Sequence, residues 1–482
     1  MRKLKVLLIQ PSFKDGVRSL FLADYIQEGI GLKPPIGLLY IATIIREKSS
    51  HEVKILDCQL DIIDKDNILE FVKEKYDVIG ISAWTDSWYQ SLKMAQALKG
   101  KYSNSFIVMG GPHVNIFPQQ ILKFNFIDAI IMGDGEIPML ELLNHLSGEN
   151  ISISQQKPNL PGLFFRGTEY TGYAPYICQN LDGLPIPDRK LLPLERYYSI
   201  ISPNKFATSM ITSRGCPFEC VFCKLGFQKP VARSAQNVIE EFEAIEKLGI
   251  KEIEIYDDTF NWSHQRTKEI CSGILKKNIK ISWAIRDRVD KVKEDVLEDL
   301  KKAGCYRMHL GVESGSDKIL QLIKKRITTE QIRRVIKMVK KHNFILLTYF
   351  MYGLPGETLA DAKKTLDFAI ELDTDYAEFS ITIPYPGTEA YLNALKEGTI
   401  PYDYWLDFTR NPLPSFEIPY VIEDMIPRKK LIELRNISVK KFYFRPKYLF
   451  NEIKKIKSLE EFLRKARIGL SLLSLARPKD SA

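Results

Sequence analysis

The sequence contains no uninterrupted apolar stretch that approaches the ~18 residues of a membrane-spanning helix. Its first ten residues have too short an apolar run for a secretory signal peptide and are more typical of a first buried strand. Cysteine is also scarce, since seven cysteines in 482 residues do not make a disulfide scaffold. These absences argue against a membrane-spanning or disulfide-rich secreted protein and favour the cytoplasm.

The excess of positive charge is confined to the C-terminal end. The segment from Arg428 to Ala482 holds 16 of the 69 Lys and Arg residues but only 5 of the 60 acidic residues, so its own charge is +11. The net charge of the whole chain is +9. Residues 1–427 therefore carry −2. A body with this charge does not favour a nucleic-acid groove, and no nucleic-acid partner is expected.

A chain of this length exceeds one ordinary hydrophobic core, so two or three domains are expected. In the first third, short apolar runs alternate with helix-like segments. This pattern predicts an α/β domain over residues 1–149, with a doubly wound parallel sheet of the Rossmann-like type. The expected strands are 4–10, 53–56, 77–82, 106–109 and 129–132, and the expected helices are 34–46, 87–99 and 138–146.

Glycine-rich turns follow the fourth and fifth expected strands and contain Gly110, Gly111, Gly133 and Gly135. Ligands of such sheets bind beyond the carboxyl ends of the strands, and glycine lets the backbone approach a ligand closely. No GxGxxG follows the first strand, so the pattern does not indicate a dinucleotide. We expect a ligand site of another kind at these turns; a domain kept for packing or partner contact is the alternative.

The middle of the chain predicts a second α/β domain. Residues 150–205 show little periodicity and many Pro, Gly and Asn residues, which indicates a linker. The alternation that follows predicts a partial (β/α)6 barrel over residues 206–395, with its chemistry at the C-terminal ends of the strands, and then a mainly helical tail over residues 396–482. The expected barrel strands are 206–212, 251–257, 280–286, 306–313, 345–353 and 376–384, and the expected helices are 234–248, 263–277, 292–303, 316–341 (broken) and 358–372.

Three cysteines, Cys216, Cys220 and Cys223, follow the first barrel strand with the spacing CxxxCxxC. Soft thiolates select zinc, copper(I) or an iron–sulfur cluster. A closed zinc site requires a fourth Cys or His at ligand spacing, whereas the next histidine is the distant His264. Three cysteines on a [4Fe–4S] cluster leave one iron open for a substrate or cofactor. A zinc knuckle and three unrelated buried cysteines remain the alternatives at this point.

This cysteine loop resembles the cluster loop of radical S-adenosylmethionine (radical SAM) enzymes. The resemblance implies a [4Fe–4S] cluster whose open iron binds SAM, and a 5′-deoxyadenosyl radical formed by reductive cleavage. Further elements, each at an expected strand end and in the family's order, favour the cluster over zinc: 257–261, 283–290, 311–316, 352–358 and 383–388. The resemblance extends over about residues 1–395.

The resemblance also implies roles for individual residues. Asp257 or Asp258 would contact the amino group of SAM, and an N-cap of the next helix is the alternative for one of them. Arg288, which fits the motif better than Arg286, would pair with the SAM carboxylate, and a surface ion pair is the alternative.

Two later strand ends complete the implied SAM site. Glu313 and Ser314 would contact the sugar and amino-acid parts of SAM, because a carboxylate can accept from ribose hydroxyls and serine adds a donor. The turn that contains Gly353 and Glu357 would place its backbone against the adenine.

The first domain resembles the cobalamin-binding domain of one large class of radical SAM enzymes. The Gly-Gly-Pro-His and Gly-Asp-Gly-Glu turns carry this resemblance, together with the Leu-Pro-x-Pro-Asp run in the linker. The DxHxxG motif of the methionine-synthase type is absent, as it is in many radical SAM members that hold cobalamin without it. A cobalt-ligand role for His113 is less favoured than a structural one. The resemblance implies that cobalamin contacts Gly110, Gly111, Gly133 and Gly135.

The tail is expected to cover the open mouth of the barrel and to influence the choice of substrate. Its apolar residues, flanked by Lys and Arg, also suit peripheral contact with an anionic membrane, although a helix docked on the barrel is favoured. The residues concerned are Leu459, Phe462, Leu463, Ile468, Leu470, Leu472 and Leu473. The remaining cysteines show no CxxC spacing, so a second cluster is not expected: Cys58, Cys178, Cys271 and Cys305.

Together these features predict a radical SAM enzyme that uses a [4Fe–4S] cluster, SAM and cobalamin to C-methylate a small-molecule or lipid-like substrate. An electron donor of the ferredoxin or flavodoxin type is expected. Radical oxidative cyclisation, as in the anaerobic magnesium-protoporphyrin cyclase, or C–C coupling is the alternative. A non-catalytic cobalamin or cluster sensor is disfavoured by the full set of SAM elements. RNA methylthiolation is disfavoured by the lack of an evident RNA-binding barrel and of a second cysteine cluster.

Overall fold

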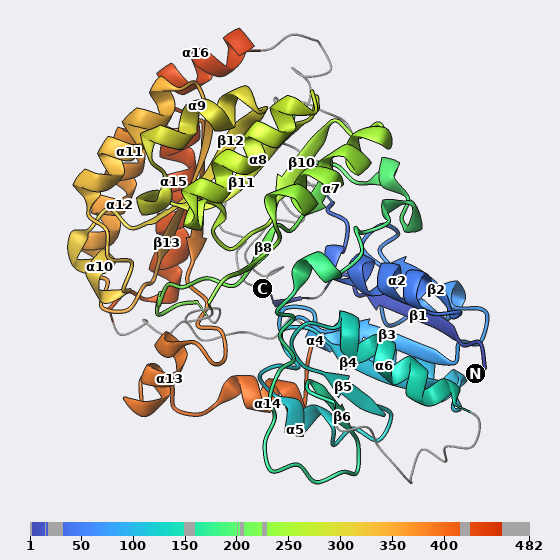
Figure 1. The fold of residues 1–482 in the computed structure, drawn as a ribbon. Helices are drawn as coiled ribbons and strands as arrows, with labels where there is room; N and C mark the ends of the chain where they lie inside the picture. Colours follow the sequence, from blue (N-terminus) through green and yellow to red (C-terminus); the bar gives the residue numbers. More distant parts are fainter. Residues whose placement is uncertain are drawn as a thin grey trace. The chain divides into compact units, whose positions relative to one another are not determined.

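The computed structural model describes residues 2–14, 16–17, 32–148, 160–199, 201–202, 207–223, 229–414 and 425–455 (Figure 1). The chain divides into two compact units. The first comprises Met1–Ser209 and Asp403–Ile418, and the second comprises Met210–Tyr402 and Pro419–Ala482.

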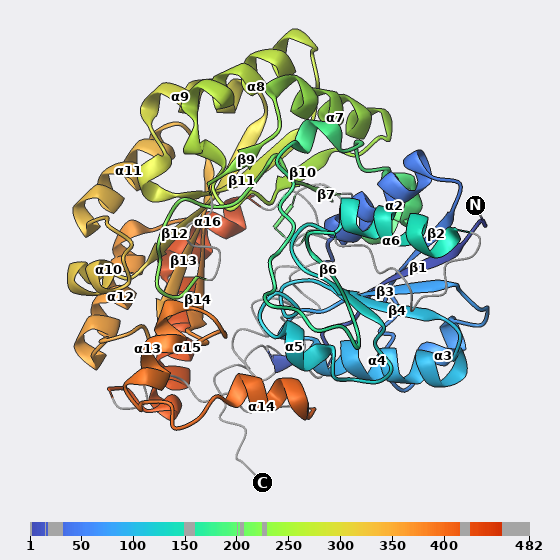
Figure 2. The same cartoon turned by 60° about the horizontal axis from the view of Figure 1, so that its bottom comes forward.

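The first unit is built on a six-stranded sheet of order β2-β1-β3-β4-β5-β6. The first five strands pair in parallel, as expected: β1 (Lys5–Gln10), β2 (Glu52–Asp57), β3 (Val78–Ser82), β4 (Phe106–Gly110) and β5 (Ala129–Ile131). Helices α2 (Ile36–Lys48) and α6 (Glu136–Ser147) cover one face, and α3 (Ile68–Phe71), α4 (Trp88–Lys101) and α5 (Pro118–Ile121) cover the other (Figure 2). Burial on both faces explains why β1, β3, β4 and β5 are almost continuously apolar, whereas the edge strand β2 carries Glu52 and Lys54 and is only partly buried.

Two elements of the first unit lie where the sequence did not indicate them. Strand β6 (Leu163–Phe165), inside the expected linker, extends the sheet by pairing antiparallel with β5. Helix α14 (Tyr404–Arg410), inside the expected tail, belongs to the first unit, where the Trp88 indole N–H donates to the Thr409 carbonyl at 3.1 Å. The first unit is therefore assembled from two distant parts of the chain.

The second unit contains the expected alternation of strands and helices. Its sheet has the order β14-β13-β12-β11-β10-β7, and the strands from β10 to β14 pair in parallel. The strands are β7 (Ala207–Met210), in which the division between the units falls, β10 (Glu252–Ile255), β11 (Ser282–Arg288), β12 (Cys305–Glu313), β13 (Ile345–Tyr352) and β14 (Tyr376–Ile381).

Helices cover the outer face of this curled sheet (Figure 1). They are α7 (Ala235–Lys247), α8 (His264–Lys276), α9 (Glu294–Lys302), α10 (Asp317–Leu322), α11 (Thr329–Lys341) and α12 (Leu359–Leu372). The expected break within 316–341 is confirmed, because α10 and α11 are separate helices. Outward-facing strand residues such as Ile253, Ile285 and Met308 are completely or almost completely buried beneath these helices.

The tail contributes α15 (Arg428–Tyr443) and α16 (Pro446–Lys455), after α13 (Glu389–Lys396). Helix α15 packs on the edge strand β14: the Tyr443 hydroxyl donates to the Ala377 carbonyl at 2.8 Å and accepts from its N–H at 3.1 Å. Phe442 contacts Phe379, which stacks on Phe350 of the outer face. This helix therefore packs against the outer side of the sheet. The expectation that the tail covers the barrel mouth stays a prediction, because residues 415–424 and 456–482 lie outside the described residues.

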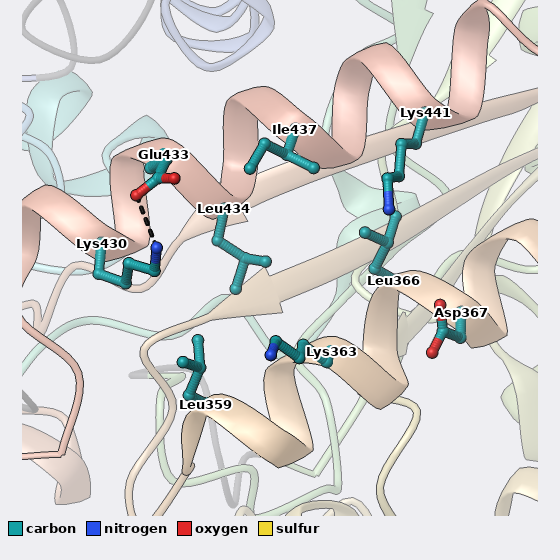
Figure 3. Close-up of a pocket in the computed structure, with 9 residues that line it drawn as sticks. All are labelled: Leu359, Lys363, Leu366, Asp367, Lys430, Glu433, Leu434, Ile437 and Lys441. Atoms are coloured by element: carbon teal, nitrogen blue, oxygen red, sulfur yellow. Dashed lines mark hydrogen bonds and ion pairs between the residues drawn. The ribbon is translucent and has the colours of Figure 1, made fainter.

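A groove of about 240 Å³ separates α12 from α15 (Figure 3). Leu366, Leu434 and Ile437 supply its apolar side chains, and Lys430 and Glu433 form an ion pair beside it. It lies between two helices of the outer face. The basic pattern beyond Lys455, with its seven apolar residues, lies outside the described residues. Within the part of the chain that the structure describes, no helix is both long and apolar enough to cross a membrane.

Candidate functional site

The three cysteines lie on a loop that is closed at its base by a short pair of strands. β8 (Ser213–Arg214) pairs antiparallel with β9 (Val231–Ala232), so the chain leaves and rejoins the barrel at one place. Cys216, Cys220 and Cys223 are all half-buried, and Cys216 Sγ lies 3.7 Å from Thr259 Oγ1. The structure thus holds the three sulfurs on one short loop beyond the C-terminal end of β7.

Asp257 and Asp258, at the end of β10, hold the base of this cysteine loop. The fully buried Asp257 accepts from the Thr212 N–H at 2.6 Å, the Thr212 hydroxyl at 2.5 Å and the Ser213 hydroxyl at 2.8 Å. Burial raises the pKa of Asp257. The exposed Asp258 accepts from the Gly215 N–H at 3.0 Å. Asp257 is enclosed by the segment that it anchors, so Asp258 is the better placed of the two for the predicted contact with SAM.

Arg288 brings a positive charge to the cysteine loop. Its Nη1 lies 3.3 Å from Cys220 Sγ, and its guanidinium lies 3.8 Å from the centre of the Phe218 ring. Nε donates to Asp290 at 2.9 Å and Nη2 to the Lys325 carbonyl at 2.5 Å. These four contacts fix the guanidinium, which leaves it pre-organised beside a thiol of the loop.

Two structural alternatives for these residues are wrong. The N-cap of α8 is Ser263, whose hydroxyl accepts from the Arg266 N–H, so neither aspartate caps that helix. Arg288 is only 7% exposed, so its pairing with Asp290 is not a surface ion pair.

A buried ion pair lies next to the same loop. Lys325 Nζ and Glu313 Oε1 are 2.7 Å apart, with side chains 5% and 10% exposed. A Cβ on Gly311 would lie 2.4 Å from Glu313 Oε1 and 2.8 Å from Lys325 Nζ, so a side chain at this position would displace the ends of both charged side chains. Burial raises the pKa of the Cys220 thiol, while the charges of Lys325 and Arg288 act against that rise. The pair therefore places a second cation near Cys220, and the charge of Glu313 offsets part of its effect on the thiol pKa.

The two remaining predicted SAM elements shape their strand ends. Ser314 is fully buried, and its hydroxyl lies 3.2 Å from Thr365 Oγ1 of α12. Glu357 Oε2 accepts from the N–H groups of Gly353 at 2.6 Å and Leu354 at 3.3 Å, and burial raises the pKa of Glu357 to about 8. Glu357 Oε1 is buried without a partner among the described residues. The contacts of Ser314, Gly353 and Glu357 with SAM remain predictions.

Sequence reasoning missed a second anchor of the cysteine loop. The Val221 N–H donates to the Ile323 carbonyl at 3.2 Å, and Glu219 forms an ion pair with Arg326. Both partners come from the connection between α10 and α11. The cationic run 324–326 was the available signal, because a cluster held by thiolates favours neighbouring positive charge.

Two of the four predicted cobalamin-contacting glycines are required by the chain itself. Gly111 has φ +104°, and a Cβ there would lie 2.8 Å from the Ala83 carbonyl oxygen. Gly133 has φ +82°, and its Cβ would lie 2.0 Å from the Tyr176 carbonyl oxygen. Both glycines therefore allow a close approach of two backbone segments, whatever ligand binds nearby.

The other two glycines differ from each other. A Cβ on Gly135 would lie 2.8 Å from Ile41 Cδ1, whereas a Cβ on Gly110 would meet nothing closer than the Ile131 carbonyl oxygen at 3.5 Å. Gly110 is thus the position of the four whose surroundings leave most room. The role of all four in binding cobalamin remains a prediction.

His113 is a structural residue. It is fully buried, its Nδ1 lies 3.2 Å from Thr85 Oγ1, its Nε2 lies 3.1 Å from Thr409 Oγ1, and its ring packs 4.5 Å from that of Trp88. Burial lowers the pKa of His113 to about 3. Both ring nitrogens have hydrogen-bond partners, so neither is free to bind cobalt, and the less favoured role as a cobalt ligand does not fit. The cysteines outside the loop are all buried: Cys58, Cys178, Cys271 and Cys305.

The donor set of the cysteine loop fits an iron–sulfur cluster. Three half-buried thiols share one loop, and Arg288 and Lys325 provide compensating positive charge. Among the described residues, no three His, Cys, Asp or Glu side chains are grouped so as to hold a single metal ion. The charges of Asp258 and Arg288 match the amino and carboxylate groups of SAM.

Comparison with known families places two matches on the two halves of the chain. Residues 31–143 match the B12 binding domain, and residues 210–369 match the Radical SAM superfamily. The first match lies within the first unit and the second within the second unit.

Two relatives and one solved structure extend this similarity. The chain is 34% identical over 462 residues to an uncharacterized methyltransferase of Pyrococcus horikoshii, covering 94% of this chain and 95% of the relative. It is 24% identical over 471 residues to the anaerobic magnesium-protoporphyrin IX monomethyl ester cyclase of Rubrivivax gelatinosus, covering 95% and 81%. The structure of the radical SAM methyltransferase TsrM from Kitasatospora setae has a similar fold, with TM-score 0.63 and 16% identity over 83% of this chain and 79% of that one.

Proposed function

This chain belongs to the family of radical SAM enzymes that carry a B12-binding domain, and on that basis we propose that it transfers a methyl group to an unactivated carbon of a small molecule. The bound cluster and SAM supply a radical that removes a hydrogen atom from carbon, and bound cobalamin supplies the methyl group. The observation that carries the proposal is the similarity to the archaeal methyltransferase, which spans both matched domains.

The residues of the second unit have distinct roles in this proposal. Cys216, Cys220 and Cys223 hold the cluster. Arg288, fixed by its contacts with Asp290 and the Lys325 carbonyl, pairs with the carboxylate of SAM. Its rigidity keeps SAM in one orientation, because the guanidinium has no freedom to follow a displaced ligand.

Asp258 and Glu313 take the remaining polar contacts. The exposed Asp258 accepts from the SAM ammonium, while Asp257 holds the base of the cysteine loop through its hydrogen bond from the Thr212 N–H. Glu313 accepts from the ribose hydroxyls and retains Lys325 as its counter-ion. We assign the SAM chemistry to residues 206–395 and cobalamin to residues 1–149. Residues 150–205 connect them and contribute β6 to the first unit, and residues 396–482 contribute α14. An electron donor of the ferredoxin or flavodoxin type completes the system.

Radical oxidative cyclisation is the second candidate. It is favoured by the similarity to the magnesium-protoporphyrin cyclase over 95% of this chain. The two reactions differ in their products, because methyl transfer consumes a second SAM and releases S-adenosylhomocysteine, whereas cyclisation releases only 5′-deoxyadenosine and methionine.

The test is anaerobic reconstitution with iron, sulfide and hydroxocobalamin, followed by SAM and a reductant. Retained cobalamin with both 5′-deoxyadenosine and S-adenosylhomocysteine supports methyl transfer. Deoxyadenosine alone supports cyclisation, and the absence of both refutes the radical reaction and revives the sensor. Cys223→Ala is expected to abolish deoxyadenosine formation. The matched control Cys178→Ala, in the first unit, is expected to retain it.

A further inference from the structure

The concave face of the barrel sheet carries a set of charged and hydrogen-bonding side chains that the proposed SAM site does not use. Strand register places Glu254 opposite Ala284, and Ala284 opposite Arg307. It also places Arg286 opposite His309, and Gly311 opposite Tyr349. Side chains alternate along a strand, so Ile253, Ile285, Met308 and Leu310 lie on the opposite face, where they are buried. The polar side chains therefore face the interior of the barrel.

The deepest layer is an ion network with no access to solvent. Arg307 Nη2 lies 2.7 Å from Glu254 Oε1 and 3.4 Å from Glu252 Oε1, and these side chains are at most 3% exposed. Glu252 also accepts from the Tyr306 hydroxyl at 2.6 Å. Arg307 thus forms ion pairs with both carboxylates, which compensates the cost of burying its charge.

The same arginine determines the proton position on His309. Arg307 Nε lies 3.0 Å from His309 Nε2, and a guanidinium N–H can only donate. Nε2 is therefore the acceptor, and the neutral ring carries its proton on Nδ1, 2.9 Å from the Tyr349 oxygen. Because Nδ1 donates to this oxygen, the hydroxyl hydrogen of Tyr349 is directed to another acceptor. Tyr349 is only partly buried, so that acceptor can come from the barrel interior.

Arg286 is less completely paired than Arg307. Its Nη2 lies 3.7 Å from Glu254 Oε2, its Nη1 lies 3.4 Å from the Ile255 carbonyl oxygen, and its side chain is 28% exposed. The guanidinium stacks on Tyr256 at 3.6 Å from the ring centre, which fixes its plane. A guanidinium has five N–H donors, and the contacts of Arg286 with Glu254 and with the Ile255 carbonyl are both long.

Arg286 and Tyr349 are close neighbours on the concave face of the barrel sheet. Burial raises the pKa of Tyr349, and the charge of Arg286 offsets part of that rise, as expected for close neighbours. On β11, Arg286 lies two residues before Arg288, which contacts Cys220, and both side chains share the concave face. Arg286 is therefore one layer deeper in the barrel than the cysteine loop.

We propose that Arg286 and Tyr349 form a substrate subsite that binds an anionic group, a carboxylate or a phosphate, inside the barrel. Arg286 donates two parallel N–H bonds and Tyr349 donates its hydroxyl, so the group is recognised by charge and geometry together. The opposing carboxylate of Glu378, across the pairing from Tyr349, confines the anion to the Arg286 side. A wholly apolar substrate would desolvate Arg286 and leave it only its long contacts with Glu254 and the Ile255 carbonyl. The identification of this bound anion as the substrate of the radical reaction rests on the proposed function.

The test is calorimetric titration of the reconstituted, SAM-loaded protein under anaerobic conditions. The probes are propionate and methyl phosphate, with propionamide as the neutral analogue of propionate. Saturable binding of one anion, at least about tenfold tighter than propionamide, is expected. Arg286→Gln is expected to weaken anion binding by about tenfold or more, and Tyr349→Phe by about threefold to tenfold, because charged hydrogen bonds exceed neutral ones.

Controls separate this subsite from general charge effects. Arg334→Gln, an exposed arginine of α11, is expected to leave anion binding unchanged. Arg286→Lys keeps the charge but loses the bidentate geometry, so intermediate affinity is expected, and Glu378→Gln is expected to strengthen binding. Iron content and melting temperature are measured for every variant; Tyr349→Phe provides an independent arm if Arg286→Gln does not fold.

Three results would overturn the subsite: no saturable anion binding, equal binding of propionamide and propionate, or unchanged anion affinity in Arg286→Gln. None of them depends on turnover. Anion binding without any deoxyadenosine from SAM refutes the proposed function while supporting the subsite. Formation of both deoxyadenosine and S-adenosylhomocysteine without anion binding supports the proposed function and refutes the subsite.

Discussion

Replacing Lys325 with methionine should destabilise the second unit strongly. The change removes an ammonium group 2.7 Å from Glu313 Oε1 and leaves a carboxylate that is only 10% exposed. At an effective dielectric constant of ~20, the direct attraction over this distance is about 6 kcal/mol, and desolvation of both charges offsets part of it. Breaking a buried pair from one side costs about 3–5 kcal/mol, so we expect a loss in that range.

Hydrogen exchange on peptides that cover β12 measures the opening free energy of this sheet without reference to the first unit. The double variant Lys325→Met with Glu313→Gln is expected to recover at least about 2 kcal/mol, because no unpaired charge remains. The matched control is Lys302→Met, whose partner Glu298 is exposed on α9; a loss under about 1 kcal/mol is expected there. A loss under 1 kcal/mol for Lys325→Met itself would refute the reasoning.

Three further perturbations test other parts of the structure. Gly133→Ala combines a positive φ with a clash against Tyr176 and should lower the melting temperature far more than Gly167→Ala, where φ is +70° and the Cβ would meet nothing within 4 Å. Because burial raises the pKa of Glu357 to about 8, the folded state binds an extra proton between about pH 4.5 and 8. Urea titrations should show the free energy of unfolding falling as pH rises through this window, by at most about 1.4 kcal/mol per pH unit. Glu357→Gln should remove that slope. For His113 the sign is opposite: the folded pKa of about 3 lies below the unfolded value, so stability should fall as pH drops from about 6.5 towards 3, and a His113→Gln variant that kept the slope would contradict this.

The sequence predicted the barrel well because local patterns determine it. The apolar strand residues of β10–β14 and the amphipathic helices between them repeat with regular spacing, so both element type and order followed. The cysteine spacing and Arg288 were equally visible, since each lies next to a recognisable turn. The capping role of Ser263, in contrast, was considered only as an alternative role of an aspartate, because several side chains near that helix start can accept the same N–H groups.

Tertiary contacts explain what the sequence did not reveal. Lys325 lies in a connection between helices, and only the folded chain brings it to Glu313. Strand β6 is three residues long and has no periodicity to detect. The glycines at 111 and 133 suggested ligand contact, but the close neighbours that require them are Ala83 and Tyr176, distant parts of the backbone.

The bond between His113 and Thr409 has a consequence for the order in which the chain folds. These residues are 296 positions apart, and the first unit is incomplete until α14 is available. At roughly 5–20 residues per second, a ribosome adds that stretch in about 15–60 s. All six strands of the barrel emerge during this interval. Most of the first unit is therefore synthesised first but completed late, and a nascent chain that pauses before residue 403 leaves Trp88 without its hydrogen bond to Thr409.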